Sequence, residues 1–212
     1  MDNTFNSKIS WFATATLSII GVGASVNPAI AQTNFDYSAT FDGISLSTFI
    51  SPNITDISYE GDSNDASLGL TQLSSLLYSE IDPVTSDTVF STNPSLFGIE
   101  DRQNGFLVFQ GNRDDKLFAS FDSSTGSINF ETGIQTLTGT VNIFGGEGRF
   151  NDAQGSLSLE GSLPIDIDPP PTEIVVNGSF TVPKSVPEAS TLVTCIALGV
   201  TGAGAMFKRH LI

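Results

Sequence analysis

The chain has 212 residues, enough for one ordinary domain besides its two end segments. Eight basic side chains stand against 23 acidic ones, a net charge of −15 at neutral pH, which excludes most binding that depends on contacts to nucleic acid or anionic lipid phosphates. The single Cys195, His210 and Trp11 all lie near the ends, so the central part has no disulfide, no thiol nucleophile and no imidazole.

The N-terminal segment has the parts of a secretory signal peptide. An apolar stretch over residues 11–26 follows Lys8, and the small residues Ala29 and Ala31 precede Gln32. A basic start, an apolar run and an Ala-x-Ala site are typical of such a peptide. We therefore expect residues 1–31 to be a signal peptide cleaved before Gln32, with a retained transmembrane helix as the alternative.

The C-terminal segment predicts a transmembrane helix. Residues 189–207 are apolar and small, and the basic pair Lys208 and Arg209 follows at once. At about 1.5 Å per residue a helix of this length reaches ~28 Å, close to the ~30 Å hydrocarbon core of a bilayer. Basic residues mark the cytoplasmic side, so the part of the chain before this helix is expected outside the cytoplasm. The signal peptide independently requires the same orientation.

Residues 32–185 carry 21 acidic and five basic side chains and alternate apolar with polar residues. A period of two predicts half-buried antiparallel strands. The alternation is clearest at Phe35, Tyr37, Ala39 and Phe41, at Leu157, Leu159, Leu163 and Ile165, and at Ile174, Val176, Phe180 and Val182. Further strands are expected around Ile54–Tyr59, Phe106–Gln110, Lys116–Asp122, Ser127–Glu131 and Thr136–Phe144. Turns are expected at Asp42-Gly43, Gly61–Asn64, Gly111-Asn112, Ser123–Gly126 and Gly145-Gly146.

Two segments are less simple. Leu70–Ser79 fits either a strand or a short helix. Ile165–Thr172 contains three prolines, which donate no ladder hydrogen bond, so it predicts an extended connection between the last two strands, or else a domain boundary. Short strands at this spacing indicate an all-β fold, an antiparallel β-barrel or a sandwich, flanked by the signal helix and the transmembrane helix.

The tail resembles the PEP-CTERM sorting signal. The carrying residues are Val186, Pro187, Glu188, Ala189, Ser190 and Thr191, followed by the apolar helix and by Lys208 and Arg209. Where the family has Pro-Glu-Pro, this chain has Ala189 in the third position. The resemblance covers residues 186–212. It implies a partnership with the secretion machinery and an exosortase-type membrane protease, transient membrane anchoring through the helix, and delivery to the cell surface or extracellular matrix near exopolysaccharide.

The central domain also resembles a domain of unknown function found in cyanobacterial PEP-CTERM proteins, through residues 61–66 and 69–71 and a glycine-rich segment. That segment is similar to a turn in dirigent and allene-oxide-cyclase barrels, a strand–turn–strand element in which Phe150 is tucked inside. The residues of this expected structural turn are Gly145, Gly146, Gly148, Arg149, Phe150 and Gly155.

No catalytic or metal-binding constellation is evident. Gly146-Glu147-Gly148 lacks the Gly-Lys-Ser/Thr of a phosphate loop, and the acidic clusters at residues 62–65, 114–115 and 166–168 do not follow the calcium-loop spacing. We expect no cofactor and a non-enzymatic surface or matrix protein. Two alternatives stay open: a calcium- or carbohydrate-binding adhesion module, and a barrel enzyme on a small apolar ligand. The last requires a lined cavity with convergent polar groups.

Overall fold

The computed structural model describes residues 31–112 and 114–184, and these form an all-β fold. The predicted signal helix up to Ile30 and the predicted transmembrane helix lie outside the described residues. The strands are β1 (Ala31–Ser51), β2 (Ile54–Asp62), β3 (Gln72–Ile81), β4 (Asp87–Ser91), β5 (Phe106–Gln110), β6 (Lys116–Ser120), β7 (Ser124–Asn129), β8 (Ile134–Glu147), β9 (Gln154–Pro164) and β10 (Pro171–Lys184). Three short 3-10 helices are η1 (Ser67–Gly69), η2 (Pro94–Phe97) and η3 (Gly148–Phe150).

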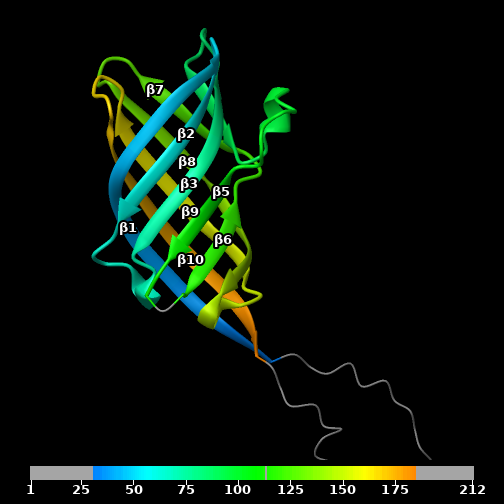
Figure 1. The fold of residues 1–212 in the computed structure, drawn as a ribbon. Coiled ribbons are helices and arrows are strands. Elements are labelled where there is room, and N and C mark those ends of the chain that lie inside the picture. Colours follow the sequence, from blue (N-terminus) through cyan, green and yellow to red (C-terminus); the bar gives the residue numbers. More distant parts are fainter. Residues whose placement is uncertain (1–30, 113, 185–212) are drawn as a thin grey trace, which may run out of the picture.

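All strand pairs are antiparallel, and the sheet wraps around one interior (Figure 1). Hydrogen-bonded neighbours follow in the order β2, β1, β10, β9, β8, β6, β5, β3, β4 and β7, with two additional pairings, β2 with β3 and β8 with β7. The pairings can therefore be followed from β2 through β1 and β8 to β3 and back to β2. Between β3 and β8, the hairpin β5–β6 fills one end and the pair β4–β7 fills the other.

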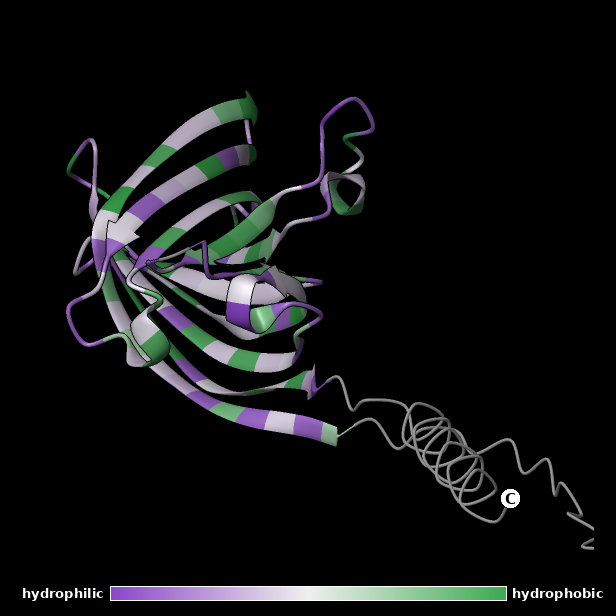
Figure 2. Cartoon of the chain, turned by 60° about the horizontal axis from the view of Figure 1, so that its bottom comes forward, coloured by the Kyte–Doolittle hydropathy of each residue, from purple (hydrophilic) through white to green (hydrophobic). Residues whose placement is uncertain are grey.

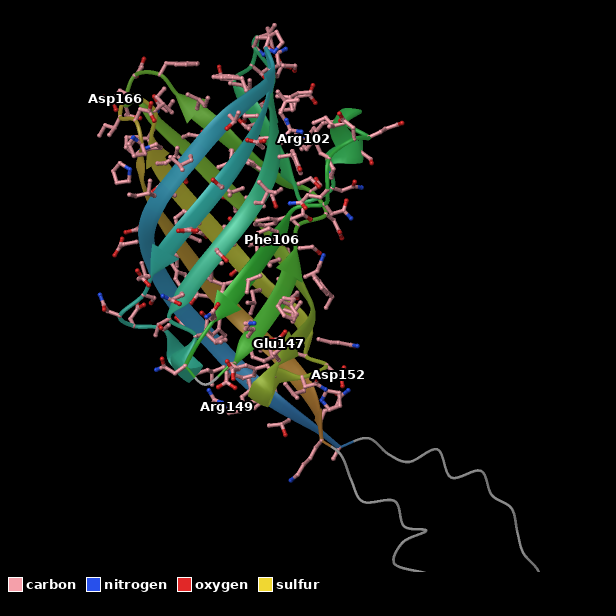
Figure 3. The ribbon with its side chains drawn as sticks, in the orientation of Figure 1. Arg102, Phe106, Glu147, Arg149, Asp152 and Asp166 are labelled. Carbon is pink, nitrogen blue, oxygen red and sulfur yellow. The ribbon has the colours of Figure 1, made fainter. Side chains whose placement is uncertain are left out.

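The two ends of the described chain meet. Strands β1 and β10 pair in a register that places Ala31 opposite Lys184. We call this end of the sheet the proximal end, and the opposite one, with the β1–β2 turn and the β9–β10 connection, the distal end. Figure 3 shows Arg149 and Asp152 near the proximal end and Asp166 at the distal end. Whatever precedes β1 and follows β10 thus leaves the domain at one place.

The predicted alternation is confirmed in the core. Figure 2 shows apolar and polar residues alternating along the strands. On β1, Tyr37, Ala39 and Phe41 are buried, whereas Asp36 and Asp42 are exposed. The largest fully buried side chains are Tyr78, Phe41, Phe109, Phe121, Phe150, Phe180, Leu70, Leu73, Leu107, Leu117, Leu157 and Leu159. At about 25 cal/mol per Å² of apolar area, such side chains stabilise a domain without any disulfide.

Three expected turns are wrong because the strands run through them. Asp42-Gly43 lies inside β1, where Gly43 faces Gly61 and a side chain on it would meet the Glu60 carbonyl. The sequence Asp-Gly therefore marks a close approach of two strands rather than a turn. Ser124 to Gly126 belong to β7, and Gly145-Gly146 belongs to β8, beside a register shift opposite Phe118 and Ala119.

Other expectations are settled by the pairings. The undecided segment around Leu70–Ser79 is strand β3. The proline-rich connection between β9 and β10 is confirmed for residues 165–170, whereas Pro171 and Thr172 already belong to β10 and pair with β1. The described residues also contain β4, which alternation alone did not predict. It is followed by a long excursion over residues 92–105 that covers Tyr78, whose hydroxyl donates to the Gln103 carbonyl at 2.8 Å.

Candidate functional site

A cavity of about 400 Å³ opens at the distal end and is lined by strands from all around the sheet. We call it the distal cavity. Its strand residues continue the inward-facing alternation of β1, β2, β3, β4, β7, β8 and β9. The lining residues are Ser47, Phe49, Asn53, Thr55, Ile57, Ser79, Ile81, Thr88, Ile128, Gln135, Leu163, Pro164, Ile165, Ile167, Asp168 and Pro170.

On β1 the inward-facing residues become smaller toward the distal end. The inward positions hold Phe35, Tyr37, Ala39 and Phe41, then Gly43, Ser45 and Ser47, before Phe49 at the rim. Serine side chains fill much less volume than the aromatic rings that precede them, so the interior is packed at one end and open at the other. A volume of this size falls within the roughly 300–1,000 Å³ of small-molecule sites.

Hydroxyl and amide groups face each other inside the cavity. Thr55 Oγ1 and Ser79 Oγ are 2.7 Å apart across β2 and β3, and Gln135 Nε2 donates to Thr88 Oγ1 at 3.5 Å. Ser79 and Thr88 are buried. The Oε1 atom of Gln135 accepts no hydrogen bond from the described residues, so it can receive one from a guest.

The cavity ends at a floor. The next inward-facing hydroxyls, of Ser45 and Thr172, are buried and joined by a 2.8 Å hydrogen bond. Toward the proximal end the interior is occupied by rings, with Phe41 and Phe109 centroids 6.0 Å apart. A lined cavity with polar groups, the feature that a barrel enzyme on a small apolar ligand would require, is present in the distal half, while the proximal half is filled by its own side chains.

The rim of the cavity is apolar. Phe49 is 77 % exposed, and Ile165 and Ile167 on the β9–β10 connection are 40 % and 50 % exposed. Asp168 is the one charged side chain among the lining residues. Large apolar side chains that line a concavity and still face solvent mark a surface whose burial by a bound molecule lowers the free energy.

The predicted structural turn lies at the proximal end, away from the cavity. Gly148 has a positive φ of 65°, which favours glycine, and a side chain there would collide with the Asp115 carboxylate. That carboxylate accepts from the backbone N–H of Arg149 at 2.9 Å and from its Nε at 2.7 Å, while Nη2 donates to the Leu68 carbonyl at 2.7 Å. Arg149 therefore fastens three segments that meet at this end.

The remaining members of the turn serve packing. The Phe150 ring is buried. Its centroid lies 5.5 Å from the centroid of the Phe180 ring, which it meets edge-on, and 5.0 Å from Cζ of Arg149. Gly155 lies against Phe180, where a side chain would overlap its backbone, while Gly146 faces the carbonyls of Lys116 and Phe150. The structure assigns the glycine-rich segment a stabilising role at the proximal end.

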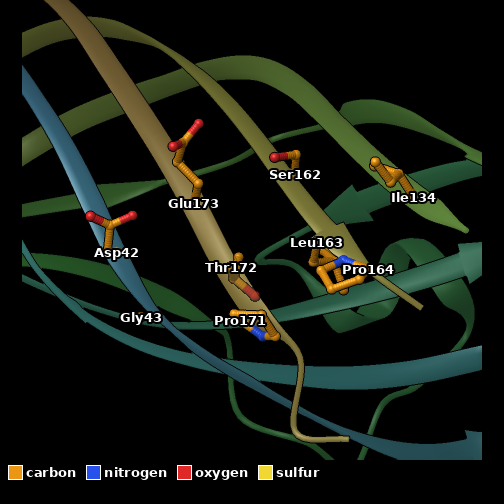
Figure 4. Close-up of a pocket in the computed structure, with 9 residues that line it drawn as sticks. All are labelled: Asp42, Gly43, Ile134, Ser162, Leu163, Pro164, Pro171, Thr172 and Glu173. Carbon is orange, nitrogen blue, oxygen red and sulfur yellow. The ribbon is translucent and has the colours of Figure 1, made fainter. Parts of the chain in front are cut away.

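A second, shallower concavity lies on the outer face (Figure 4). The carboxylates of Asp42 and Glu173 flank it, with Ser162 on the neighbouring strand. Among the described residues, no group of three or more His, Cys, Asp or Glu side chains is placed to hold a metal ion. The acidic residues of this face act on the domain through their charge, as discussed below.

The structure describes only some of the predicted site residues. Ala31 and Gln32 begin β1, whereas Ala29, the sorting residues Val186, Pro187, Glu188 and Ala189, and the basic pair Lys208 and Arg209 lie outside the described residues. Within the described part of the chain, no helix is long and apolar enough to cross a membrane.

Sequence reasoning missed the distal cavity. The available signal was the replacement of Phe and Tyr by Ser along the inward positions of β1, but its meaning depends on which strands meet there. Comparison with known proteins adds no guide, because no family model, no curated protein and no solved structure matches the chain.

Proposed function

We propose that this chain is an exported, non-enzymatic surface protein whose β domain is delivered by the C-terminal tail and processed by an exosortase-type protease. We also infer that the sheet is a closed β-barrel rather than a sandwich. The circuit of pairings from β2 through β1, β10, β9, β8, β6, β5 and β3 back to β2 supports this, since a sandwich would leave two sheets with open edges.

The observation that carries the proposal is the meeting of the two ends of the described part of the chain. Because Ala31 pairs with Lys184, the predicted signal cleavage site and the start of the predicted tail lie at the same end of the barrel. A tail in the membrane would then hold the proximal end toward the bilayer. The distal cavity, at the opposite end, would face outward.

The chemistry of the cavity supports binding rather than catalysis. General acid–base catalysis uses a titratable side chain placed at the reacting atoms, whereas the polar lining here consists of hydroxyls and amides, with Asp168 at the rim.

Two buried tyrosines outside the cavity have structural hydrogen bonds. Burial raises the pKa of Tyr37 and of Tyr59, so both phenols stay protonated; Tyr37 donates to the Leu70 carbonyl and Tyr59 to the Phe41 carbonyl.

The test is the intact mass of the protein in the membrane fraction and in the medium of its native host. The proposal predicts a product in the medium that begins at Gln32 and ends between Val186 and Ala189. A variant with Lys208 and Arg209 changed to glutamine, which removes the basic end of the predicted tail, is the matched control and should lose processing. Absence of the product from the medium, with the whole chain including residues 1–31 recovered from the cells, would refute export.

A further inference from the structure

We propose that the distal cavity is a binding site for a small uncharged molecule with an apolar body and one hydrogen-bond donor. This inference goes beyond export and does not depend on how the tail is processed. It rests on three observations: the shape of the cavity, its neutral polar groups and its exposed apolar rim.

The shape selects a small molecule over a macromolecule. The cavity is open at the distal rim, is lined by successive strands of the wrapped sheet and includes the buried side chains of Ser79 and Thr88. A small molecule can reach these side chains between the strands, whereas a flat protein surface would cover the rim alone. Its volume of about 400 Å³ accommodates a molecule of two or three fused or linked rings or a short acyl chain.

The polar groups select a neutral ligand. The lining holds no Lys or Arg to neutralise an anion, and the surrounding domain carries 21 acidic side chains. An anion would therefore lose its hydration without gaining a counter-charge. A cation would meet only Asp168, which is exposed at the rim and well hydrated.

The lining offers an acceptor to a ligand donor. Gln135 Nε2 donates to Thr88 Oγ1 at 3.5 Å, while Gln135 Oε1 accepts no hydrogen bond from the described residues. A ligand N–H or O–H can bond Gln135 Oε1 while its apolar part covers Ile57, Ile81 and the rim. Burying that apolar surface supplies most of the affinity.

N-phenyl-1-naphthylamine is a suitable probe because it is neutral, apolar and carries one N–H donor. The full chain is held in phosphatidylcholine nanodiscs, and Phe49→Trp places an energy-transfer donor at the rim, where Phe49 is 77 % exposed. Phe144→Trp, at a 63 % exposed phenylalanine on the outer face toward the proximal end, is the matched reporter. Trp11 contributes the same background fluorescence to both tryptophan variants. We expect saturable transfer to the dye from position 49 and not from position 144.

Two pairs of variants locate the ligand, each measured in the Phe49→Trp background. Ser47→Phe fills the cavity and should weaken binding about tenfold or more, whereas Thr48→Phe, on the opposite face of the same strand, should leave it unchanged. Gln135→Leu removes the acceptor and should weaken binding about three- to tenfold, whereas Gln110→Leu on the outer face should not.

Charge selectivity completes the test. 8-Anilino-1-naphthalenesulfonate has the same ring system with an added sulfonate and should show no saturable transfer from position 49. Equal transfer from both reporter positions, or equal binding by Ser47→Phe and Thr48→Phe, would mean that the dye only partitions into lipid, and would overturn the proposal. Transfer that appears only after residues 186–212 are deleted would also overturn it, because the tail would then be the occupant.

Discussion

Asp42 and Glu173 lie directly opposite each other on β1 and β10, with both carboxylates exposed on the outer face (Figure 4). On its other side Asp42 pairs with Asp62 of β2, so three acidic residues stand in one row across adjacent strands. Like charges in directly opposite positions destabilise a sheet. This row is a local cost of the acidic surface.

Replacing Glu173 with glutamine should therefore stabilise the domain, by about 0.2–1 kcal/mol at low salt, with a smaller gain at high salt because ions screen exposed charges. Thermal unfolding at two salt concentrations measures this. Glu160→Gln is the control, since Glu160 pairs with Val175 and Thr138 and faces no charge. Equal gains from the two variants would assign the effect to net charge rather than to the pair.

Asp65 should make stability depend on pH. The backbone N–H of Thr40, first, and the Ser63 hydroxyl, second, hold the pKa of Asp65 below its usual range, both by hydrogen bonds of 2.8 Å to Oδ1. The ionised carboxylate thus favours the fold above the unfolded-state pKa of about 4, and this contribution is lost as the pH falls through the folded-state pKa. Asp65→Asn should lower the melting temperature at neutral pH, and the gap to the parent should close in acid. Asp36→Asn, on the exposed face of β1, controls for the loss of one negative charge. A gap between Asp65→Asn and the parent that persists in acid would contradict the prediction.

Arg149→Ala should destabilise the domain by about 1–3 kcal/mol, toward the lower value because the guanidinium is 58 % exposed although its partner Asp115 is only 7 % exposed. Arg149→Lys should recover part of the loss, since lysine keeps the charge but not the planar fork. Denaturant unfolding gives the difference. Arg102→Ala removes an exposed ion pair with Asp56 and should cost no more than ~1 kcal/mol. Similar losses for Arg102 and Arg149 would show that the latter is an ordinary surface ion pair.

Ser124→Ala should stabilise the domain by about 1 kcal/mol. Ser124 is buried, and its hydroxyl has no hydrogen-bond partner among the described residues, so burial removes it from water without compensation. Ser91→Ala should have the opposite effect, because the Ser91 hydroxyl donates to the Asp122 carbonyl at 2.8 Å and accepts from the Asn93 N–H at 3.0 Å. Urea midpoints compare the two. A loss of stability in Ser124→Ala would show that the hydroxyl is satisfied in solution.

The proposed outward orientation of the distal end can be checked in cells. Val84, 89 % exposed in the turn between β3 and β4, can be changed to cysteine, as can the exposed Asp152 at the proximal end. A bulky membrane-impermeant maleimide should label Val84→Cys faster than Asp152→Cys while the tail is attached. The two rates should become equal once the tail is removed. Faster labelling of position 152 would reverse the proposed orientation.

The sequence predicted the strands better than the turns. Alternation located the inward faces of β1, β9 and β10, because burying one face of a sheet imposes a period of two. The turns at Asp42-Gly43 and Gly145-Gly146 were wrong because glycine serves two purposes: it permits positive φ, and it lets backbones approach closely. Only the register, with Gly43 opposite Gly61, distinguishes them.

The cavity could not be predicted from sequence for a related reason. Ser47, Thr55 and Gln135 are polar residues in three separate strands, and residues of these types are equally common on a solvent-facing surface. They form a site because the pairings bring the inward faces together at one end. In the glycine-rich segment the turn begins at Gly148 rather than at Gly145, because β8 continues to Glu147, and the Arg149 contacts were not foreseen.

The position of β10 also has a mechanical meaning. This strand is the one that continues toward the tail, and it is hydrogen-bonded along most of its length to β1 on one side and to β9 on the other. A pull on whatever the distal end holds, resisted at Lys184, loads both ladders parallel to the strands. Many hydrogen bonds then bear the force together, instead of opening one after another. Strand β10 is thus placed to resist shear when force acts between the distal end and Lys184.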